Sequence, residues 1–148
     1  MSDIPDGFRA ITLPGGFFDE HGPIYTRLEG SVPVTGFRVM QRHINPFGVC
    51  QGGVMASFAD MQALSAMHLA GITDRYTPTV NLTLDFIAPA TLGMWVELRT
   101  ELMRATRSLL FSRGLISADG TLIVRASGIF KVGRAAHAGR KDEAPAFL

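Results

Sequence analysis

The sequence has a single cysteine, Cys50, among its 148 residues, so no disulfide can form within the chain. This cysteine usage is typical of proteins in a reducing compartment. No uninterrupted apolar run reaches the roughly 20 residues that a membrane-spanning helix needs. The first ten residues, MSDIPDGFRA, contain acidic side chains and no apolar run, which argues against a secretory signal. We therefore expect a cytoplasmic protein without a membrane partner.

An excess of charge of one sign is also lacking. The chain carries 14 basic and 13 acidic residues, for a formal net charge of +1. This balance gives no electrostatic reason to expect nucleic acid as a partner. Charged residues make up only 18% of the chain and apolar residues 47%, which favours a globular domain with some surface buried between subunits. We predict one domain over residues 1–148, with a core at about 24–133 and a polar tail at 134–148.

Hydrophobic periodicity predicts an α+β domain. Residues 1–23 are interpreted as a loose lead-in, residues 24–42 as extended, and residues 43–51 as a loop. From Gly52 to about Gly71 the apolar period becomes helical and covers nearly every side of the helix. Four strands without crossover helices follow, which predicts an antiparallel meander curled around the helix. Asp119-Gly120 marks a hairpin between the last two of them.

Asp60 is the single carboxylate within this apolar helix. The residues that share its face are Ala56, Ser57, Ala63 and Leu64, none of which is a cation. A carboxylate buried without a partner is costly, so it is paired, protonated or functional, and desolvation would raise its pKa. The alternative is that Asp60 faces a wet edge of the fold. The pattern alone favours neither interpretation.

The helix begins at the glycine pair Gly52-Gly53, which predicts a second polar feature. The first N–H groups of a helix have no intrahelical partner and carry partial positive charge, so they suit a developing oxyanion. The alternative is that the glycines let the helix pack closely on a strand. Gly52 and Asp60 are eight residues apart, about 12 Å along a helix axis. If both act on one carbonyl group, they must come from two chains whose helices run side by side.

These residues resemble a known family, the PaaI-like thioesterases of the hotdog fold. The resemblance rests on the run from His43 to Gly53 (HINPFGVCQGG), on Asp60, on Thr79, and on Phe86 to Ala90 with Gly93 after it. It spans about residues 34–132. It implies a long central helix wrapped by a curved antiparallel sheet. It also implies acyl- or aryl-CoA thioesters as substrates, neither metal nor cofactor, and a homodimer or homotetramer.

The resemblance implies a role for each matched residue. Asp60 is the base or nucleophile, and the N–H of Gly52 from the opposite subunit is the oxyanion donor. Asn45 positions the loop and the attacking water or acyl group, and Thr79 binds the water or steadies Asp60. Gln51 stands where the family usually has histidine; its amide donates a hydrogen bond but carries no proton at neutral pH.

Substrate-binding candidates come from two regions. Gly53, Phe58 and Met61, together with Met55 and Met67, are candidates for an acyl pocket, although ordinary core packing is the better default explanation of the apolar ones. The second region is the segment around residues 104–108, where Arg104, Arg107 and Ser108 are candidates for the phosphates of coenzyme A. The four histidines show no metal-ligand spacing, and Cys50 is interpreted as buried and inert.

Three functions remain open from the sequence. Thioester hydrolysis comes first. A non-catalytic acyl-CoA sensor is the alternative, because of Gln51. A hotdog hydratase or dehydratase is third, since Ser65 rather than histidine stands five residues after Asp60. The acyl group, the choice between coenzyme A and an acyl-carrier protein, the choice between dimer and tetramer, and the choice between base and nucleophile for Asp60 also stay open.

Overall fold

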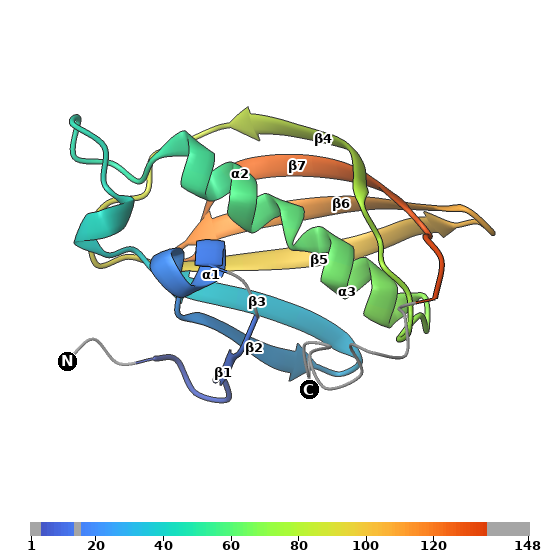
Figure 1. The fold of residues 1–148 in the computed structure, drawn as a ribbon. Helices are drawn as coiled ribbons and strands as arrows, with labels where there is room; N and C mark the ends of the chain where they lie inside the picture. The colour runs from blue at the N-terminus through green and yellow to red at the C-terminus, as the bar shows by residue number, and fades with distance from the viewer. Residues whose placement is uncertain (1–3, 14–15, 136–148) are drawn as a thin grey trace.

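The computed structural model describes residues 4–13 and 16–135 and contains one antiparallel sheet crossed by a helix (Figure 1). The predicted tail at 134–148 lies almost wholly outside the described residues. In chain order the elements are β1 (Arg9–Ile11), α1 (Gly16–His21), β2 (Ile24–Glu29), β3 (Val32–Arg38), the 3-10 turn η1 (Gln41–His43), α2 (Gly52–Asp60), α3 (Gln62–Leu69), β4 (Thr79–Phe86), β5 (Trp95–Ala105), β6 (Leu109–Ala118) and β7 (Thr121–Lys131).

The seven strands pair in the order β1-β2-β3-β5-β6-β7-β4, and every pairing is antiparallel. Helices α2 and α3 lie end to end across one face of this sheet (Figure 1). The arrangement is the hotdog fold, so the predicted α+β class is confirmed. No helix among the described residues is long and apolar enough to cross a membrane.

The main core fills the space between the helix and the sheet. Strand residues on the helix-facing side alternate with outward ones, as the two-residue period requires, and Phe37, Val96, Leu98 and Ile116 are fully buried there. Phe58 of α2 packs edge-on against Phe37, with 4.7 Å between ring centroids. The helix is thus fixed to the sheet by its apolar side, and its other side stays partly open.

Two expectations about the strands were wrong. The first 23 residues are not merely a loose lead-in, because they contain β1 and α1. The four strands after the helix are also not a simple meander: β4 pairs with β7 at the sheet edge, and β5 pairs with β3. The β6–β7 turn follows its prediction, with Asp119 at φ 44° and Gly120 at φ 83°. A two-residue turn forces the two strands that it joins to pair with each other. The connection between β4 and β5 has eight residues, which is long enough for the chain to cross the sheet.

The predicted helix is interrupted once, at Met61, and ends close to the predicted residue. The buried Gln62 fills this break: its Nε2 donates to the carbonyl of Ala59 at 3.0 Å, and its Oε1 accepts from the hydroxyl of Ser112 at 3.0 Å. Its amide is therefore satisfied beneath the helix, as a buried polar group requires. Asp60 consequently occupies the last position of α2, directly before the break.

Candidate active site

Asp60 forms a short hydrogen bond with the first residue of β4. The hydroxyl of Thr79 donates to Asp60 Oδ1 at 2.7 Å. Asp60 is half-buried, so it is neither sealed in the core nor fully in water. The bond uses Oδ1 and leaves Oδ2 of the same carboxylate for a ligand or water. A carboxylate oriented in this way can take a proton from water or attack a carbonyl carbon.

A β-bulge aims Thr79 at the helix. Simple alternation along the strand would place Thr79 on the side opposite Leu82. The register passes from Thr79, opposite Phe130, to Leu82, opposite Gly128, which is three steps on β4 and two on β7. The extra residue turns Thr79 to the face of the buried Phe130, which packs against Ala66 of α3. The bulge therefore creates the contact with Asp60.

The start of α2 is held by a buried histidine. The backbone N–H of Gln51 donates to the carbonyl of His43 at 2.7 Å. The His43 ring accepts from the Met40 N–H at Nδ1 (3.0 Å) and donates from Nε2 to the carbonyl of His21 (2.8 Å). Since Nδ1 must keep its lone pair, the ring is neutral, and burial lowers the pKa of His43 below its usual value of 6.5.

Gly52 occupies the first position of this helix. Gln51, the N-cap residue, is exposed and makes no side-chain capping bond. The N–H of Gly52 is one of the donors that a helix cannot satisfy internally. A Cβ added at Gly52 would contact ring atoms of Phe86 at 3.6 and 3.7 Å, which is ordinary van der Waals distance. The Gly52 end of the helix therefore lies against the last residue of β4.

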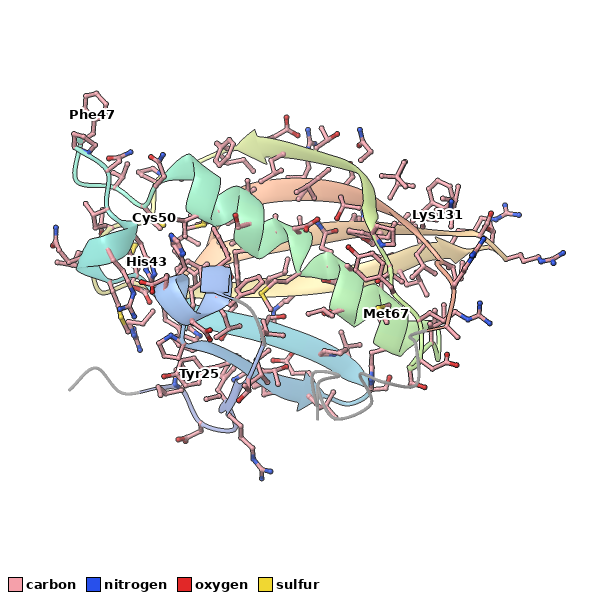
Figure 2. All side chains as sticks on the ribbon, in the orientation of Figure 1. Tyr25, His43, Phe47, Cys50, Met67 and Lys131 are labelled. Atoms are coloured by element: carbon pink, nitrogen blue, oxygen red, sulfur yellow. The ribbon has the colours of Figure 1, made fainter. Side chains whose placement is uncertain are left out.

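Asn45 organises the loop before the helix. Its Oδ1 accepts from the N–H groups of Phe47 at 2.9 Å and Val49 at 3.3 Å. Its backbone N–H also donates to the carbonyl of Val49 at 2.8 Å, which closes a tight turn. This turn displays Phe47 to solvent at the helix-start end of the molecule (Figure 2). These bonds hold the turn itself, and the role expected for Asn45 in the reaction stays a prediction.

A groove of about 370 Å³ lies beside the helix start. Asn45 and Gly52 border it, and its remaining walls are mostly apolar. They come from the loop, from α2, from the end of β4, from the β4–β5 connection and from β7, and include Val49, Cys50, Met55, Phe86, Ile123 and Val124. Asp60 and Thr79 are not among the residues that line it. One chain therefore has the N–H of Gly52 beside a groove, and the Asp60 carboxylate elsewhere.

Cys50 lines the groove but is not a nucleophile of the usual kind. The residue is buried, and burial raises the pKa of its thiol to about 11. At neutral pH the thiol therefore stays protonated, and the thiolate is the reactive form. The expectation of a buried, inert cysteine agrees with this environment.

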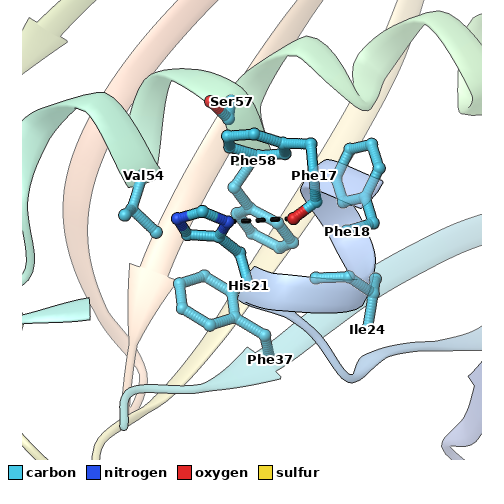
Figure 3. Close-up of a pocket in the computed structure, with 8 residues that line it drawn as sticks. All are labelled: Phe17, Phe18, His21, Ile24, Phe37, Val54, Ser57 and Phe58. Carbon is cyan, nitrogen blue, oxygen red and sulfur yellow. Dashed lines mark hydrogen bonds between the residues drawn. The ribbon is translucent and has the colours of Figure 1, made fainter. Parts of the chain in front are cut away.

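The acyl-pocket candidates lie in different places. Phe58 and Met61 are buried in the main core, and Gly53 is exposed on the helix. Phe58 also borders a small cavity beneath α1, where the rings of Phe17 and His21 cover it (Figure 3). That cavity has a volume of about 10 Å³, room for about one water. Neither Phe58 nor Met61 lines the groove in this chain; Met55 does.

Arg104, Arg107 and Ser108 belong to the end of β5 and to the β5–β6 turn, and all three are exposed. This turn is at the opposite end of the sheet from the start of α2 (Figure 1). Lys131 and Phe47, labelled in Figure 2, mark these two ends. Within one chain, the predicted phosphate-binding residues are therefore remote from the groove.

Sequence reasoning did not find the walls that β7 contributes. Ile123 and Val124 are distant from the helix start in sequence, and they look like ordinary strand residues. Phe86 to Ala90 supported the resemblance, but no pattern showed that they border the helix start. The alternation along β7 could have indicated an inward face, although not which residues reach the groove.

Comparison with known proteins agrees with this fold. The model of the thioesterase superfamily matches residues 47–124. A Pseudomonas aeruginosa protein named "Putative esterase PA0474" is 28% identical over 131 residues, covering 88% of this chain and 98% of its own. The phenylacetic acid degradation protein PaaI of Thermus thermophilus, solved as a point mutant, shares the fold with a TM-score of 0.68 at 20% identity, over 78% of this chain and 97% of its own.

A hypothetical thioesterase of Streptococcus pneumoniae TIGR4, solved with coenzyme A, also shares the fold. Its TM-score is 0.66 at 15% identity, over 76% of this chain and 88% of its own. The fold and the family match define a hotdog protein of the thioester-hydrolase class. Because the family match covers more than half of the sequence, the chain belongs to the thioesterase superfamily.

Proposed function

We propose that the protein hydrolyses acyl-CoA thioesters to a free acid and coenzyme A, at a site that two subunits share. The observation that carries this proposal is the division of the site along β4. Asp60 contacts Thr79 at the start of the strand, and Gly52 lies against Phe86 at its end. One half of the site supplies a carboxylate and the other supplies an N–H donor, and the hydrolysis of one thioester needs both.

Strand β4 favours a dimer because it lies at the edge of the sheet, with one side unpaired among the described strands. All of its residues are exposed or half-buried, and Val80 and Phe86 are each 59% exposed. Such an edge is a template for pairing with another strand. Two copies of β4 paired antiparallel about an axis between Leu82 and Thr83 form a closed, two-fold interface.

That pairing would bring the two halves of the site together. In this register Thr79 of one subunit lies opposite Phe86 of the partner subunit. Asp60, bonded to Thr79, then approaches Gly52 of the partner subunit, which lies against that Phe86. A dimer of this kind contains two such sites, and a tetramer would be a pair of these dimers.

The chemistry follows from the atoms in each half. The thioester carbonyl oxygen accepts from the Gly52 N–H, and Asn45 and the Gln51 amide lie beside it as further polar groups. Acting as a base, Asp60 removes a proton from water, whose oxygen attacks the carbonyl carbon; the C–S bond then breaks, and the thiolate of coenzyme A takes up that proton. Acting as a nucleophile, Asp60 forms an anhydride with the acyl carbon as the C–S bond breaks; water then hydrolyses the anhydride, which frees the acid and Asp60 and supplies the proton for the thiolate. Because Thr79 donates to Oδ1 of Asp60, Oδ2 is the oxygen that remains available to take the proton or to attack.

The same dimer gives the basic end of the sheet a role. The turn with Arg104, Arg107 and Ser108 lies at the end of the molecule that also carries the start of β4. Antiparallel pairing directs this end towards the groove of the partner subunit. These cations would then meet the phosphates of a coenzyme A whose thioester lies at Gly52 of the partner subunit. The coenzyme A bound to the Streptococcus pneumoniae relative supports this carrier.

The test is thiol release from a panel of acyl- and aryl-CoA substrates. Asp60→Asn is expected to lower kcat/KM by roughly 10³-fold, because an amide can neither accept the proton nor attack. Asp85→Asn is the matched control, since Asp85 is an exposed acid of β4 that pairs with Arg125 and does not contact Asp60. It should retain wild-type turnover.

Size-exclusion chromatography with light scattering shows whether the variants keep the wild-type assembly. Equal turnover by Asp60→Asn and wild type would refute the assignment. Micromolar binding of acyl-CoA with no thiol release would instead indicate the non-catalytic sensor, in which Gln51 replaces a catalytic group.

A further inference from the structure

The groove beside Gly52 is lined almost entirely by apolar side chains. Its walls are built from Val49, Cys50, Met55, Phe86, Ile123 and Val124, together with the connection 87–90. Among the residues that line it, no side chain is charged. Asn45 is the polar side chain among them, and its Oδ1 is already used by two backbone N–H groups of its own loop.

This chemistry decides which part of a thioester the groove can receive. The pantetheine arm of coenzyme A carries two amides and a hydroxyl, which cost free energy if they are buried without hydrogen-bond partners. The groove offers few such partners beyond the Gly52 N–H, which is needed by the carbonyl oxygen. An acyl chain has no polar group beyond that carbonyl, and burying it in apolar walls is favourable. The acyl group therefore fits the groove, and the pantetheine arm lies outside it.

The walls also discriminate between acyl groups by charge. A carboxylate at the far end of an acyl chain would be buried without a cation to pair it, which is strongly unfavourable. The Cys50 thiol lies in the same apolar environment. Burial raises the pKa of this thiol to about 11 and so disfavours its anion. Neutral chains meet no such penalty.

Resting on the proposed function, we infer that this groove binds the acyl group and selects neutral, apolar acyl groups over those that end in a carboxylate. Ile87 lies at its rim, lines it and is 54% exposed. A cation introduced there would face the groove without being buried in the core. Ile87 is therefore the position at which this selectivity can be changed.

The experiment compares hexanoyl-CoA with adipoyl-CoA, which have equal chain length and differ by a terminal carboxylate. The kcat/KM of the wild type should be at least roughly 100-fold higher for hexanoyl-CoA than for adipoyl-CoA. Ile87→Arg should reduce that ratio at least roughly tenfold by pairing the carboxylate. Leu92→Arg is the matched control, because Leu92 is 57% exposed in the same connection and does not line the groove. It adds the same charge and should leave the ratio unchanged.

Comparable turnover of both substrates by wild type would overturn the inference while leaving thioester hydrolysis intact. An equal change of the hexanoyl-to-adipoyl ratio in Leu92→Arg would also overturn the inference, because the added charge would then act at long range and not within the groove. Calorimetric titration of Asp60→Asn with the same two thioesters repeats the comparison without turnover, so a failure of the catalytic proposal is distinguishable. Equal affinities in that titration would contradict the selectivity directly.

Discussion

The two ends of β4 carry different chemistry. At its start Thr79 bonds the carboxylate of Asp60, in a half-open position at the end of α2. At its end Phe86 lies against Gly52, where α2 begins and an apolar groove opens. The first end has an ionisable group and no groove residues; the second has a groove, an N–H donor and no charged side chain lining it. Each end lacks what the other has.

This difference explains why one helix serves both ends. Gly52 and Asp60 mark the first and last positions of α2, and β4 runs alongside it with both ends in reach. Two-fold pairing of β4 would exchange the ends, so that each carboxylate meets the other subunit's donor. The two ends can be altered separately, and deleting the Gly52 N–H is expected to have a larger effect than removing the Thr79 hydroxyl.

Removing the N–H of Gly52 should impair catalysis more than removing the hydrogen bond that Thr79 donates to Asp60. Gly52→Pro deletes that donor at the first helical position, where proline is tolerated. Gln51, with φ −55° and ψ 132°, already has the conformation preferred before proline. We expect kcat to fall by roughly 10²–10³-fold.

Gly52→Ala is the control for this change. It keeps the N–H, and its Cβ would meet Phe86 at ordinary contact distance. It should retain most of the activity, measured by thiol release. Equal losses in the proline and alanine variants would mean that the space at Gly52 matters and the N–H does not.

Weakening the other end should have a smaller effect. Thr79→Val removes the hydroxyl that donates to Asp60 Oδ1 and keeps the shape of the side chain. Because the carboxylate remains but loses its orientation, we expect kcat to fall by roughly tenfold, about 1.4 kcal/mol. Thr83→Val is the matched control, since Thr83 donates to Asn81 and does not contact Asp60. A larger loss in Thr83→Val than in Thr79→Val would contradict the role of Thr79.

The Gly52 end should also be the more sensitive to acid, through His43. Its pKa is lowered in the folded protein by burial, so the unfolded chain binds the proton more readily. Stability from the neutral ring is complete above the unfolded pKa of about 6.5 and declines as pH falls below it. The charged or titratable neighbours are Arg42 and His21, and both oppose protonation of the ring.

Thermal unfolding of wild type and His43→Gln at pH 7.5 and pH 5.5 tests this. The variant is expected to be less stable at pH 7.5, because glutamine cannot reproduce both ring hydrogen bonds. The difference between the two proteins should be smaller at pH 5.5 than at pH 7.5, because the neutral ring then stabilises the wild-type fold less. A difference that stays constant would contradict a lowered pKa of His43 in the folded protein.

The sequence predicted the helix, its glycine start and Asp60 because each depends on local signals. Helical periodicity and a lone carboxylate are visible within about 20 residues of chain. The resemblance added Thr79, but the strand alternation placed it on the wrong side of β4. Its contact with Asp60 depends on a bulge, which arises from pairing with β7 and leaves no local signal.

Other features depended on packing between distant segments. The place of β4 at the sheet edge follows from the long β4–β5 connection, whose path no composition fixes. The groove joins the loop at Asn45 with Ile123 and Val124 of β7, so its walls exist only in the folded chain. Phe58 and Met61 were candidates because helical spacing cannot separate a core side chain from a pocket side chain; both are buried in the core.

Mixing two inactive variants tests the shared site most directly. Asp60→Asn and Gly52→Pro chains are unfolded together, refolded as an equal mixture and assayed for thiol release. A mixed dimer has one site with both an intact Asp60 and an intact Gly52 of the partner subunit, so the mixture should regain roughly a quarter of wild-type activity. If each site were built from one chain, no mixed dimer would hold an intact site, and activity no higher than that of the separate variants would contradict the account.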